Sequence, residues 1–588
     1  MRQKLAIATV LLALGAPCLE AAVPPSEWGV AVLELGSSPE TRVEQLALRN
    51  CLHSMGIPFL ATADVEEAAR RPLIFIGGIP LNTEITPAER ETLYAYVEQG
   101  GVVLATQVQG NMFFPLFGLV NATTSRSNFR IHFIDLENPA LRYLNRPQER
   151  TISLGDPKLY SETVWTTEYS PGPRTKVLAR YENGAAAMTV YPYGRGMAYA
   201  LGPGFKETTL LPQLARSFEA ARQWINSFEP SGDVFRLLLR GVYEDSVHPF
   251  LLVHTLPEGK KAALVLSHDV DAQESFRNSL AFAQMEATFG VRSTFFVTTK
   301  YFRDAADVGY YTPESVRWLQ QVSRMGFPVG SHSVSHALTF DDFPVGSPDV
   351  NKENYQPAQP TVFGEVRVSK QLLDRDLHQA TKGFRSGYLR YPSELLRVLE
   401  DSGYVYDSSV SAQYVLTNFP YFGFRRRVLG AEQSKIVVVP VTLDDSRDFL
   451  TPETQEQALR TWTEIIRANA ENGAATSLLI HPTDITYKLE TERRLIAAHL
   501  GEDTWIGDVG SLAHFWRARA ELRPVVRKNK DGGATIVLNW RRDELPAGQT
   551  LVVEARPGTS PPQVVDAAGE LVPVRRREAG DRIFLLLP

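Results

Sequence analysis

Two histidines and two aspartates are the residues of this sequence best suited to chemistry. His332 and His336 are four residues apart, and Asp269 and Asp271 flank a single valine. Neutral imidazoles and carboxylates are the ligands that zinc and similar divalent metals take in hydrolytic sites. This set can hold one cation and leave a carboxylate free for proton transfer. It therefore points to a metal-dependent hydrolase.

Two later residues add a fixed cation and a third histidine. Arg385 lies in the stretch 383–388, and His481 directly follows the apolar run 477–480. Taken singly, each has an ordinary explanation, because arginines are common in surface turns and histidines at strand ends. Their order along the chain and their shared placement at strand ends favour a catalytic interpretation.

The elements that must position these residues form a central α/β region, residues 260–522. Apolar strands are predicted at 262–267, 293–297, 436–441 and 476–480, and a helix at 313–325. This alternation predicts a distorted (β/α) barrel, whose sites lie at the carboxyl ends of the strands. The spacing of His332 and His336 predicts that both rings lie on one face of a helical turn. An Asp-x-Asp pair alone is weaker, since it often forms a turn or a cap.

Residues 262–520 resemble the polysaccharide deacetylases with NodB homology, the family 4 carbohydrate esterases. The resemblance implies that Asp269 is the catalytic base and that the metal ligands are Asp271, His332 and His336. It implies that His481 is the catalytic acid. Val270 separates aspartates that are adjacent in many members of the family.

The third motif of that family is matched by Arg385 and Tyr388, although Gly387 replaces its proline. The resemblance implies that Arg385 orients Asp269 and that the backbone N–H of Tyr388 stabilises the oxyanion. The fourth motif is not clear. Asp407 is the first candidate for the carboxylate that tunes His481, and Asp444 is the second.

The chain around this region suggests an exported protein of several domains. Residues 1–22 read as a signal peptide, with Arg2 and Lys4 before an apolar run. The net charge of −6 gives no sign of nucleic-acid binding. No later stretch is apolar enough for a permanent membrane span, so we expect a periplasmic or secreted protein.

Residues 28–205 are expected to form an N-terminal α/β domain. Strands at 30–35, 73–76 and 102–105 alternate with helices, one of them opened by a capping box at Thr86, and Asn183-Gly184 predicts a hairpin. The domain resembles the flavodoxin-like sheet of class I glutamine amidotransferases. These enzymes need a cysteine at a strand-to-helix elbow, whereas Cys51 falls within a predicted helix. We therefore expect this domain to be non-catalytic.

Two further segments complete the chain. Residues 206–258 are expected to form a helical connector. Residues 525–588 contain short strands separated by glycine and proline, which is typical of a small β-sandwich.

The combined expectation is a hydrolase that removes N-acetyl groups from an extracellular or cell-envelope polysaccharide. Zinc is the expected metal, with nickel, cobalt or iron as alternatives. Partners among exopolysaccharide assembly or export proteins would suit this role, and the oligomeric state is open. The alternatives are an O-acetyl esterase or non-sugar amidohydrolase on the same fold, a catalytically silent carbohydrate-binding protein, and a non-haem iron oxygenase.

Overall fold

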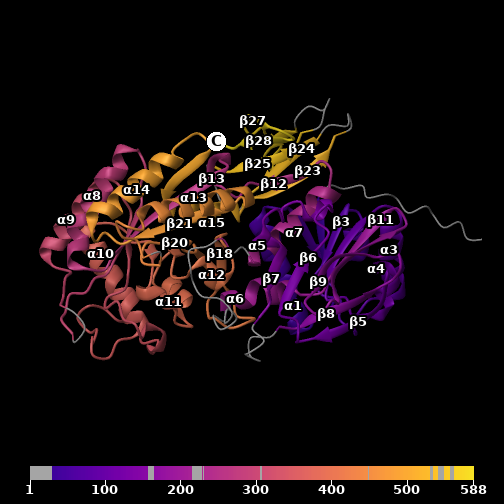
Figure 1. Cartoon of the computed structure of the whole chain (residues 1–588), viewed down its shortest axis with the longest axis horizontal. Helices are drawn as coiled ribbons and strands as arrows, with labels where there is room; N and C mark the ends of the chain where they lie inside the picture. The colour runs from indigo at the N-terminus through magenta and orange to yellow at the C-terminus, as the bar shows by residue number, and fades with distance from the viewer. Residues whose placement is uncertain are drawn as a thin grey trace, which may run out of the picture.

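The structure, a computed structural model, shows three units along the chain. It describes residues 29–155, 164–214, 228, 231–304, 308–447, 449–529, 534–540, 548–555 and 562–588. The predicted signal peptide lies outside these residues. The N-terminal lobe and the larger central lobe lie side by side, and the yellow C-terminal strands lie over their junction (Figure 1).

The N-terminal lobe is built on one mixed sheet. Strands β2, β1, β3, β4 and β11 are parallel neighbours, and β10 and β9 extend the sheet antiparallel, so the predicted parallel sheet and hairpin are both present. The strands are β1 (Val30–Leu33), β2 (Phe59–Thr62), β3 (Leu73–Ile76), β4 (Val102–Thr106), β5 (Leu119–Ser125), β6 (Arg130–Phe133), β7 (Thr151–Ser153), β8 (Thr166–Pro171), β9 (Lys176–Tyr181), β10 (Ala186–Tyr193) and β11 (Gly196–Leu201).

Helices cover both faces of this sheet because strand side chains alternate in direction. On β1, Val30 and Val32 pack with helix α1 (Pro39–Met55), and the residues between and after them pack with α3 (Pro87–Glu98) on the other face. The predicted capping box at Thr86 opens α3. Cys51 is buried within α1, where its thiol contacts Thr209.

The central unit is a curled sheet whose strands run parallel except β18, in the order β18, β19, β17, β16, β15, β14, β13, β21, β20, with β22 also on β13. The strands are β13 (Ala262–Val270), β14 (Thr294–Val297), β15 (Val329–Ser331), β16 (Gly383–Phe384), β17 (Tyr406–Asp407), β18 (Tyr421–Phe424), β19 (Gln433–Val438), β20 (Leu443–Asp444), β21 (Ala475–Ile480) and β22 (Thr504–Asp508).

The segment 433–444 makes this sheet barrel-like. Its first part, β19, pairs with β17, and its last part, β20, pairs with β21. Between them, the backbone N–H of Thr442 donates to Ser477. One stretch of chain thus connects the two ends of the curl, and the strands' carboxyl ends gather on one side.

Helices pack around the outside of the curl, and their apolar side chains share a core with Leu264 and Leu266 of β13. They are α8 (Gln273–Thr288), α9 (Pro313–Arg324), α10 (Ser369–Leu377), α13 (Gln455–Asn472) and α14 (Ile485–His499). Helix α15 (Val509–Arg519) instead packs in the core that continues into the N-terminal lobe. Among the described residues, no helix combines the length and apolarity needed to cross a membrane.

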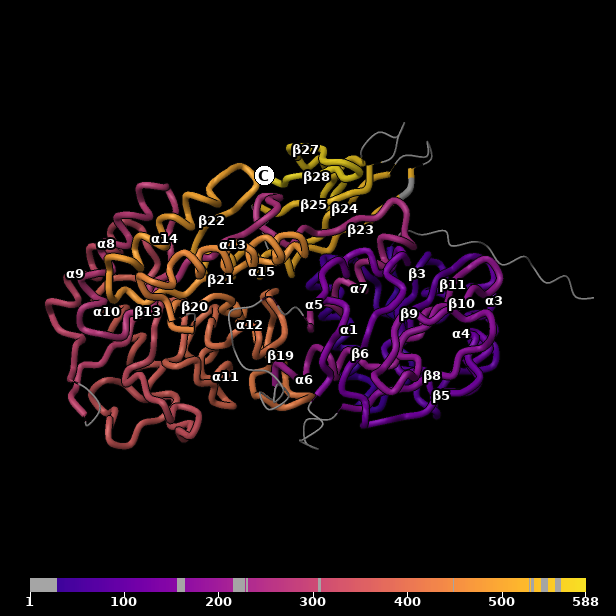
Figure 2. The backbone as a smooth tube through the Cα atoms, in the orientation of Figure 1, coloured from indigo at the N-terminus to yellow at the C-terminus, as the bar shows by residue number. Residues whose placement is uncertain are grey.

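The C-terminal unit consists of two small sheets around a shared apolar core. One sheet contains β12 (Leu251–Val253), β25 (Thr550–Glu554), β28 (Arg582–Leu586) and β27 (Arg575–Ala579), and the other contains β23 (Arg523–Lys528), β24 (Ala534–Asn539) and β26 (Gln563–Val565). Strand β12 comes from the segment expected to be a helical connector. The rest of that segment includes α7 (Ser231–Ser246), which packs against α1 (Figure 2).

Arg519, at the end of α15, connects all three units. Its guanidinium donates to the backbone carbonyls of His53 at 2.9 Å and Ser54 at 3.0 Å, at the carboxyl end of α1. It also donates to the carbonyls of Val253 at 3.0 Å and His254 at 2.8 Å, in and after β12. The negative end of the α1 dipole favours a cation at this position.

Replacing Arg519 by methionine is expected to destabilise the protein by at least about 3 kcal/mol. Hydrogen bonds to a charged group contribute about 1.5–3 kcal/mol each, and the variant removes the guanidinium donor from all four carbonyls. Urea unfolding followed by circular dichroism measures the effect. Arg517→Met, in the same helix turn but only half-buried, is the matched control. Equal midpoints for the two variants would contradict this role.

Candidate metal centre and active site

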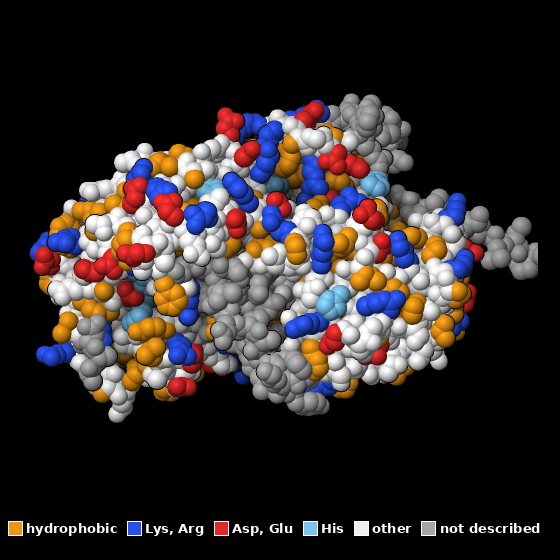
Figure 3. Space-filling view, in the orientation of Figure 1, with side chains coloured by type: hydrophobic (Ala, Val, Ile, Leu, Met, Phe, Trp, Pro, Cys, Tyr) orange, Lys and Arg blue, Asp and Glu red, His pale blue; other side chains and the backbone are white. Residues whose placement is uncertain are grey.

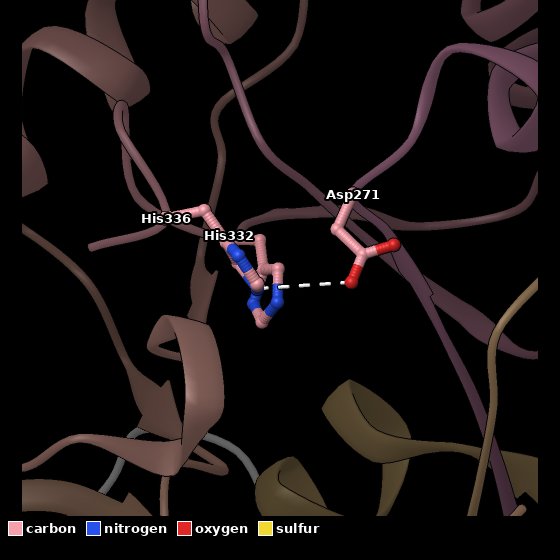
Figure 4. A group of neighbouring side chains, drawn as sticks. All are labelled: Asp271, His332 and His336. Carbon is pink, nitrogen blue, oxygen red and sulfur yellow. Dashed lines mark ion pairs between the residues drawn. The ribbon is translucent and has the colours of Figure 1, made fainter. Parts of the chain in front are cut away.

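The three residues predicted as metal ligands meet at the carboxyl ends of β13 and β15. Asp271 follows β13, and His332 and His336 follow β15. Their donor atoms lie within 4.8 Å of one another, and Nε2 of His336 is 3.7 Å from a carboxylate oxygen of Asp271. Figure 4 shows both imidazole rings lying together, across from the Asp271 carboxylate. The three side chains are close enough to share one cation.

The segment that carries the two histidines is a loop, and the predicted helical turn is wrong. Ser333 and His336 have φ of 66° and 55°, in the left-handed region that a right-handed turn excludes. A buried carboxylate, Glu365, accepts hydrogen bonds from the two N–H groups in the middle of the loop at 2.9 and 2.7 Å. Tyr355 donates to the other oxygen of Glu365 at 2.5 Å. The centroids of the His332 and His336 rings are nevertheless 4.9 Å apart, because the Glu365 carboxylate holds the loop in a folded conformation.

Both histidines direct Nε2 toward the aspartates of the site. Nδ1 of His332 lies 2.8 Å from the carbonyl of Arg385, which accepts only from a protonated nitrogen, so Nε2 is the nitrogen of this ring that could bind a metal. Burial, followed by the neighbouring His332, lowers the pKa of His336 to about 3, so that ring is neutral. Two imidazole nitrogens and one carboxylate are a ligand set that fits a zinc-type divalent cation.

Asp269 lies beside this group and is held as an anion. Arg385 donates to one oxygen at 2.8 Å, and the other oxygen is 3.6 Å from Nε2 of His332. Burial favours the neutral carboxyl, but Arg385 and then His332 outweigh it, so the pKa of Asp269 lies below its ordinary value. The hydroxyls of Ser267 and Ser408 accept from the guanidinium at 3.0 and 2.9 Å and fix its direction.

His481 approaches the same group from β21. Its Nε2 is 3.8 Å from Asp271, and its Nδ1 is 2.7 Å from Asp445, whose other oxygen is 2.7 Å from Nζ of Lys488. Burial disfavours the imidazolium, but Asp445 and then Asp271 raise the pKa of His481 to about 10. A cation beside Asp271 would lower this value by repulsion.

The carboxylate that bonds to His481 differs from the one expected. Asp407, the first candidate, ends β17 and accepts from the N–H and O–H of Ser409 at 3.2 and 2.5 Å. Asp444, the second, accepts from the backbone N–H of Ser446 at 2.7 Å. Asp445 makes the contact instead. The pair of aspartates after a predicted strand was the available signal, but the sequence does not show which of two adjacent side chains faces the site.

Asp445→Asn is expected to reduce kcat/KM of the hydrolysis about 100-fold, within the range that acid–base groups contribute. It should also move the alkaline limb of the pH profile to lower pH, because the charge that keeps His481 protonated is lost. A pH series of initial rates measures both effects. Asp407→Asn is the control, and a displaced alkaline limb in that variant with none in Asp445→Asn would restore the original expectation.

Tyr388 lies at the rim of the site. Its ring is 4.3 Å from that of His336, its side chain is 55% exposed, and its φ is 53°. Among the described residues, none accepts a hydrogen bond from its backbone N–H. A Cβ on Gly387 would come within 2.6 Å of the His336 ring. In this loop conformation a side chain at position 387 would therefore collide with the His336 ring.

The site is partly open to solvent. The side chains of His336, Asp271 and His481 are 14%, 18% and 20% exposed, so they are accessible from outside the protein. In the space-filling view, histidine and acidic side chains adjoin one another on the central lobe (Figure 3).

Comparison with known proteins identifies the central segment. Residues 260–406 match the model of the polysaccharide deacetylase family, and this segment of the chain belongs to that family. The resemblance inferred from the motifs is thereby confirmed. The match includes Asp269, Asp271 and both loop histidines, and it ends before Asp445 and His481. No curated protein matches the chain.

Several solved structures are similar to the chain. One is assigned as a polysaccharide deacetylase from Mycobacterium smegmatis, with 18% identity and a TM-score of 0.35 over 45% of this chain and 94% of that one. A chitin deacetylase from the fungal pathogen Colletotrichum lindemuthianum has 16% identity and a TM-score of 0.29 over 44% and 89%. A family 4 pseudoenzyme from Bacillus anthracis has 15% identity and a TM-score of 0.28 over 44% and 66%.

Proposed function

We propose that this protein is a metal-dependent hydrolase that removes N-acetyl groups from an extracellular or cell-envelope polysaccharide and releases acetate. The observation that carries the proposal is the placement of Asp269 and His481. Each lies within 4 Å of one of the three proposed metal ligands but is not itself a ligand. A carboxylate base and an imidazole acid beside such a group are what amide hydrolysis requires.

Asp271, His332 and His336 would hold the cation. When bound, a divalent cation supplies Lewis acidity that activates water and polarises the substrate carbonyl. Asp269 accepts the proton of the attacking water, and its ion pair with Arg385 keeps it charged and oriented between turnovers. The fixed guanidinium also prevents the carboxylate from rotating away from the attack position.

His481 donates a proton to the leaving amine, and its bond to Asp445 keeps the ring protonated and correctly oriented. The backbone N–H of Tyr388 donates to the developing oxyanion, an interaction worth about 3 kcal/mol when well placed. The exposed Tyr388 ring at the rim offers an apolar face to a sugar. These roles together would yield acetate and a free amino sugar.

The export of the protein rests on the predicted signal peptide and belongs to the same proposal. A polymer outside the cell suits a site that is partly open to solvent in a chain with two further units. Zinc is the proposed cation, with nickel, cobalt or iron as alternatives.

Two alternatives use the same residues differently. An O-acetyl esterase needs the same base but not a strong acid, because an alkoxide leaves more easily than an amine. A silent binder needs neither Asp269 nor His481. The Asp445–Lys488 support behind His481 favours the deacetylase, because it holds a protonated acid in place.

The test is acetate release by protein starting at residue 23 from matched oligomers of N-acetylglucosamine, N-acetylgalactosamine and O-acetyl xylose. We expect release from an N-acetyl oligomer, with a loss in Asp445→Asn that is larger for amide than for ester substrates. Release confined to the O-acetyl oligomer would favour the esterase. Absence of release from all three, with metal bound, would favour the silent binder.

A further inference from the structure

A second group of metal-type side chains lies on the opposite face of β13 from the active site. His268 immediately precedes Asp269, but its ring points outward, between the sheet and the surrounding helices. There it meets Glu286 of α8 and Glu492 of α14, and donor atoms of the three residues lie within 4.8 Å of one another. All three side chains are fully buried, so this group is separate from the open site.

The hydrogen bonds of His268 leave one ring nitrogen for this group. Nδ1 is 3.0 Å from the backbone carbonyl of Ile480, which requires a proton on that nitrogen. Nε2 is 2.7 Å from a carboxylate oxygen of Glu286 and 3.7 Å from one of Glu492. Metal-ligating histidines commonly donate one ring N–H to a backbone carbonyl, and this bond leaves Nε2 of His268 directed at the two carboxylates.

Three of the four carboxylate oxygens have no partner outside this trio. Both oxygens of Glu492 and one of Glu286 are buried and accept no hydrogen bond from other described residues, and the two carboxyl groups contact each other. The remaining oxygen of Glu286 accepts from the hydroxyl of Ser293 at 3.0 Å. Burial raises the pKa of Glu286 to about 8 and raises the pKa of Glu492 well above its usual value. The rings of Phe282 and Phe295 contact His268 and exclude water.

We propose that His268, Glu286 and Glu492 bind a structural divalent cation, of the zinc or manganese type, distinct from the catalytic one. Two carboxylates and a neutral imidazole balance the charge of one divalent ion, which removes the penalty of burying them unpaired. One nitrogen and carboxylate oxygens suit ions of intermediate hardness. Because no solvent path is needed for a structural ion, it would be taken up during folding.

This ion would stabilise the back of the active site. It would tie α8 and α14 to β13 next to Asp269. Through the bond from His268 to Ile480, it would also fix the end of β21, from which His481 projects. Loss of the ion should therefore mainly lower the stability of the protein. A smaller effect should be a displacement of His481 and Asp269 in the active site.

The test counts metal in protein from residue 23 onward, in a His336→Ala background that removes a ligand of the open site. The protein is unfolded in guanidinium with EDTA, refolded with excess zinc, treated again with EDTA and analysed by mass spectrometry. We expect about one equivalent of zinc to remain, because a buried ion exchanges only on unfolding. Adding Glu492→Gln, which keeps the shape but removes one charge, should abolish retention.

Two controls make the outcome decisive. Glu149→Gln alters a carboxylate that is also fully buried but bonds to Asn472, and it should leave retention unchanged. Glu286→Gln provides a second variant if Glu492→Gln does not fold. Absence of EDTA-resistant zinc in the His336→Ala protein would show that protons neutralise the carboxylates, and would overturn the proposal. Unchanged retention in both Gln variants would overturn it as well.

Discussion

Asp269→Asn is expected to reduce kcat about 1,000-fold while the protein keeps its catalytic metal. The lost carboxylate is the proposed proton acceptor, and such groups contribute about 100- to 10,000-fold. Asparagine retains an oxygen that can accept from Arg385, so the buried guanidinium is not left without an acceptor. The measurement is the rate of acetate release together with metal content by mass spectrometry.

This substitution separates a chemical role from a structural one. Removing one partner of a buried ion pair can cost about 3–5 kcal/mol, so unfolding must be checked by circular dichroism. Asp341→Asn, an exposed carboxylate beyond the histidine loop that pairs with Arg390, is the control and should retain activity. Near-normal turnover by folded Asp269→Asn protein would show that another residue accepts the proton.

His336→Ala is expected to weaken binding of the catalytic metal at least about 100-fold and to lower activity accordingly. Loss of even a supporting residue typically weakens metal affinity about 10- to 100-fold, and His336 is one of three direct ligands in this proposal. Titration of chelator-treated protein with zinc, followed by calorimetry, measures the affinity. The other two ligands remain, so a large excess of zinc should restore part of the activity.

His514→Ala provides the matched control for this experiment. His514 lies on α15, bonded to the carbonyl of Gly510 and away from the metal-type residues. Its removal should change neither affinity nor rate. If His336→Ala binds zinc as tightly as the unsubstituted protein, the three-residue metal site is wrong.

Elements with strong local patterns were predictable from sequence. Strand β3 begins and ends where expected, because its four residues are all apolar and fully buried. The capping box of α3 was predictable because it depends only on neighbouring residues. Strand β2 was not predicted, since it is a half-exposed edge strand with no clear alternation.

The site was predictable where its motif is local and less so where it depends on distant contacts. The spacing of His332 and His336 indicated that their rings meet, but the reason is Glu365, 29 residues further on. Likewise, the partner of His481 directly follows β20, and no local pattern distinguishes Asp445 from Asp444. The outward-facing trio at His268 joins three elements and has no sequence signature.

The packing of the domains on one another also depends on contacts between residues that are distant in sequence. Strand β12 pairs with β25, whose residues lie about 300 positions later, and the pairing follows from tertiary packing rather than local sequence. The hydrogen bonds of Arg519 likewise depend on carbonyl acceptors in α1 and in and after β12. Contacts between residues so far apart in the sequence leave no local periodic pattern from which they could be predicted.

Acetate release with and without metal tests the central claim most directly. Protein from residue 23 onward is treated with EDTA, desalted, and assayed on N-acetylhexosamine oligomers before and after zinc is restored. The account predicts release that falls to background after chelation, returns with zinc, and stays absent in Asp269→Asn protein. Release that persists after the catalytic metal has been removed, or that Asp269→Asn supports at the normal rate, would contradict it.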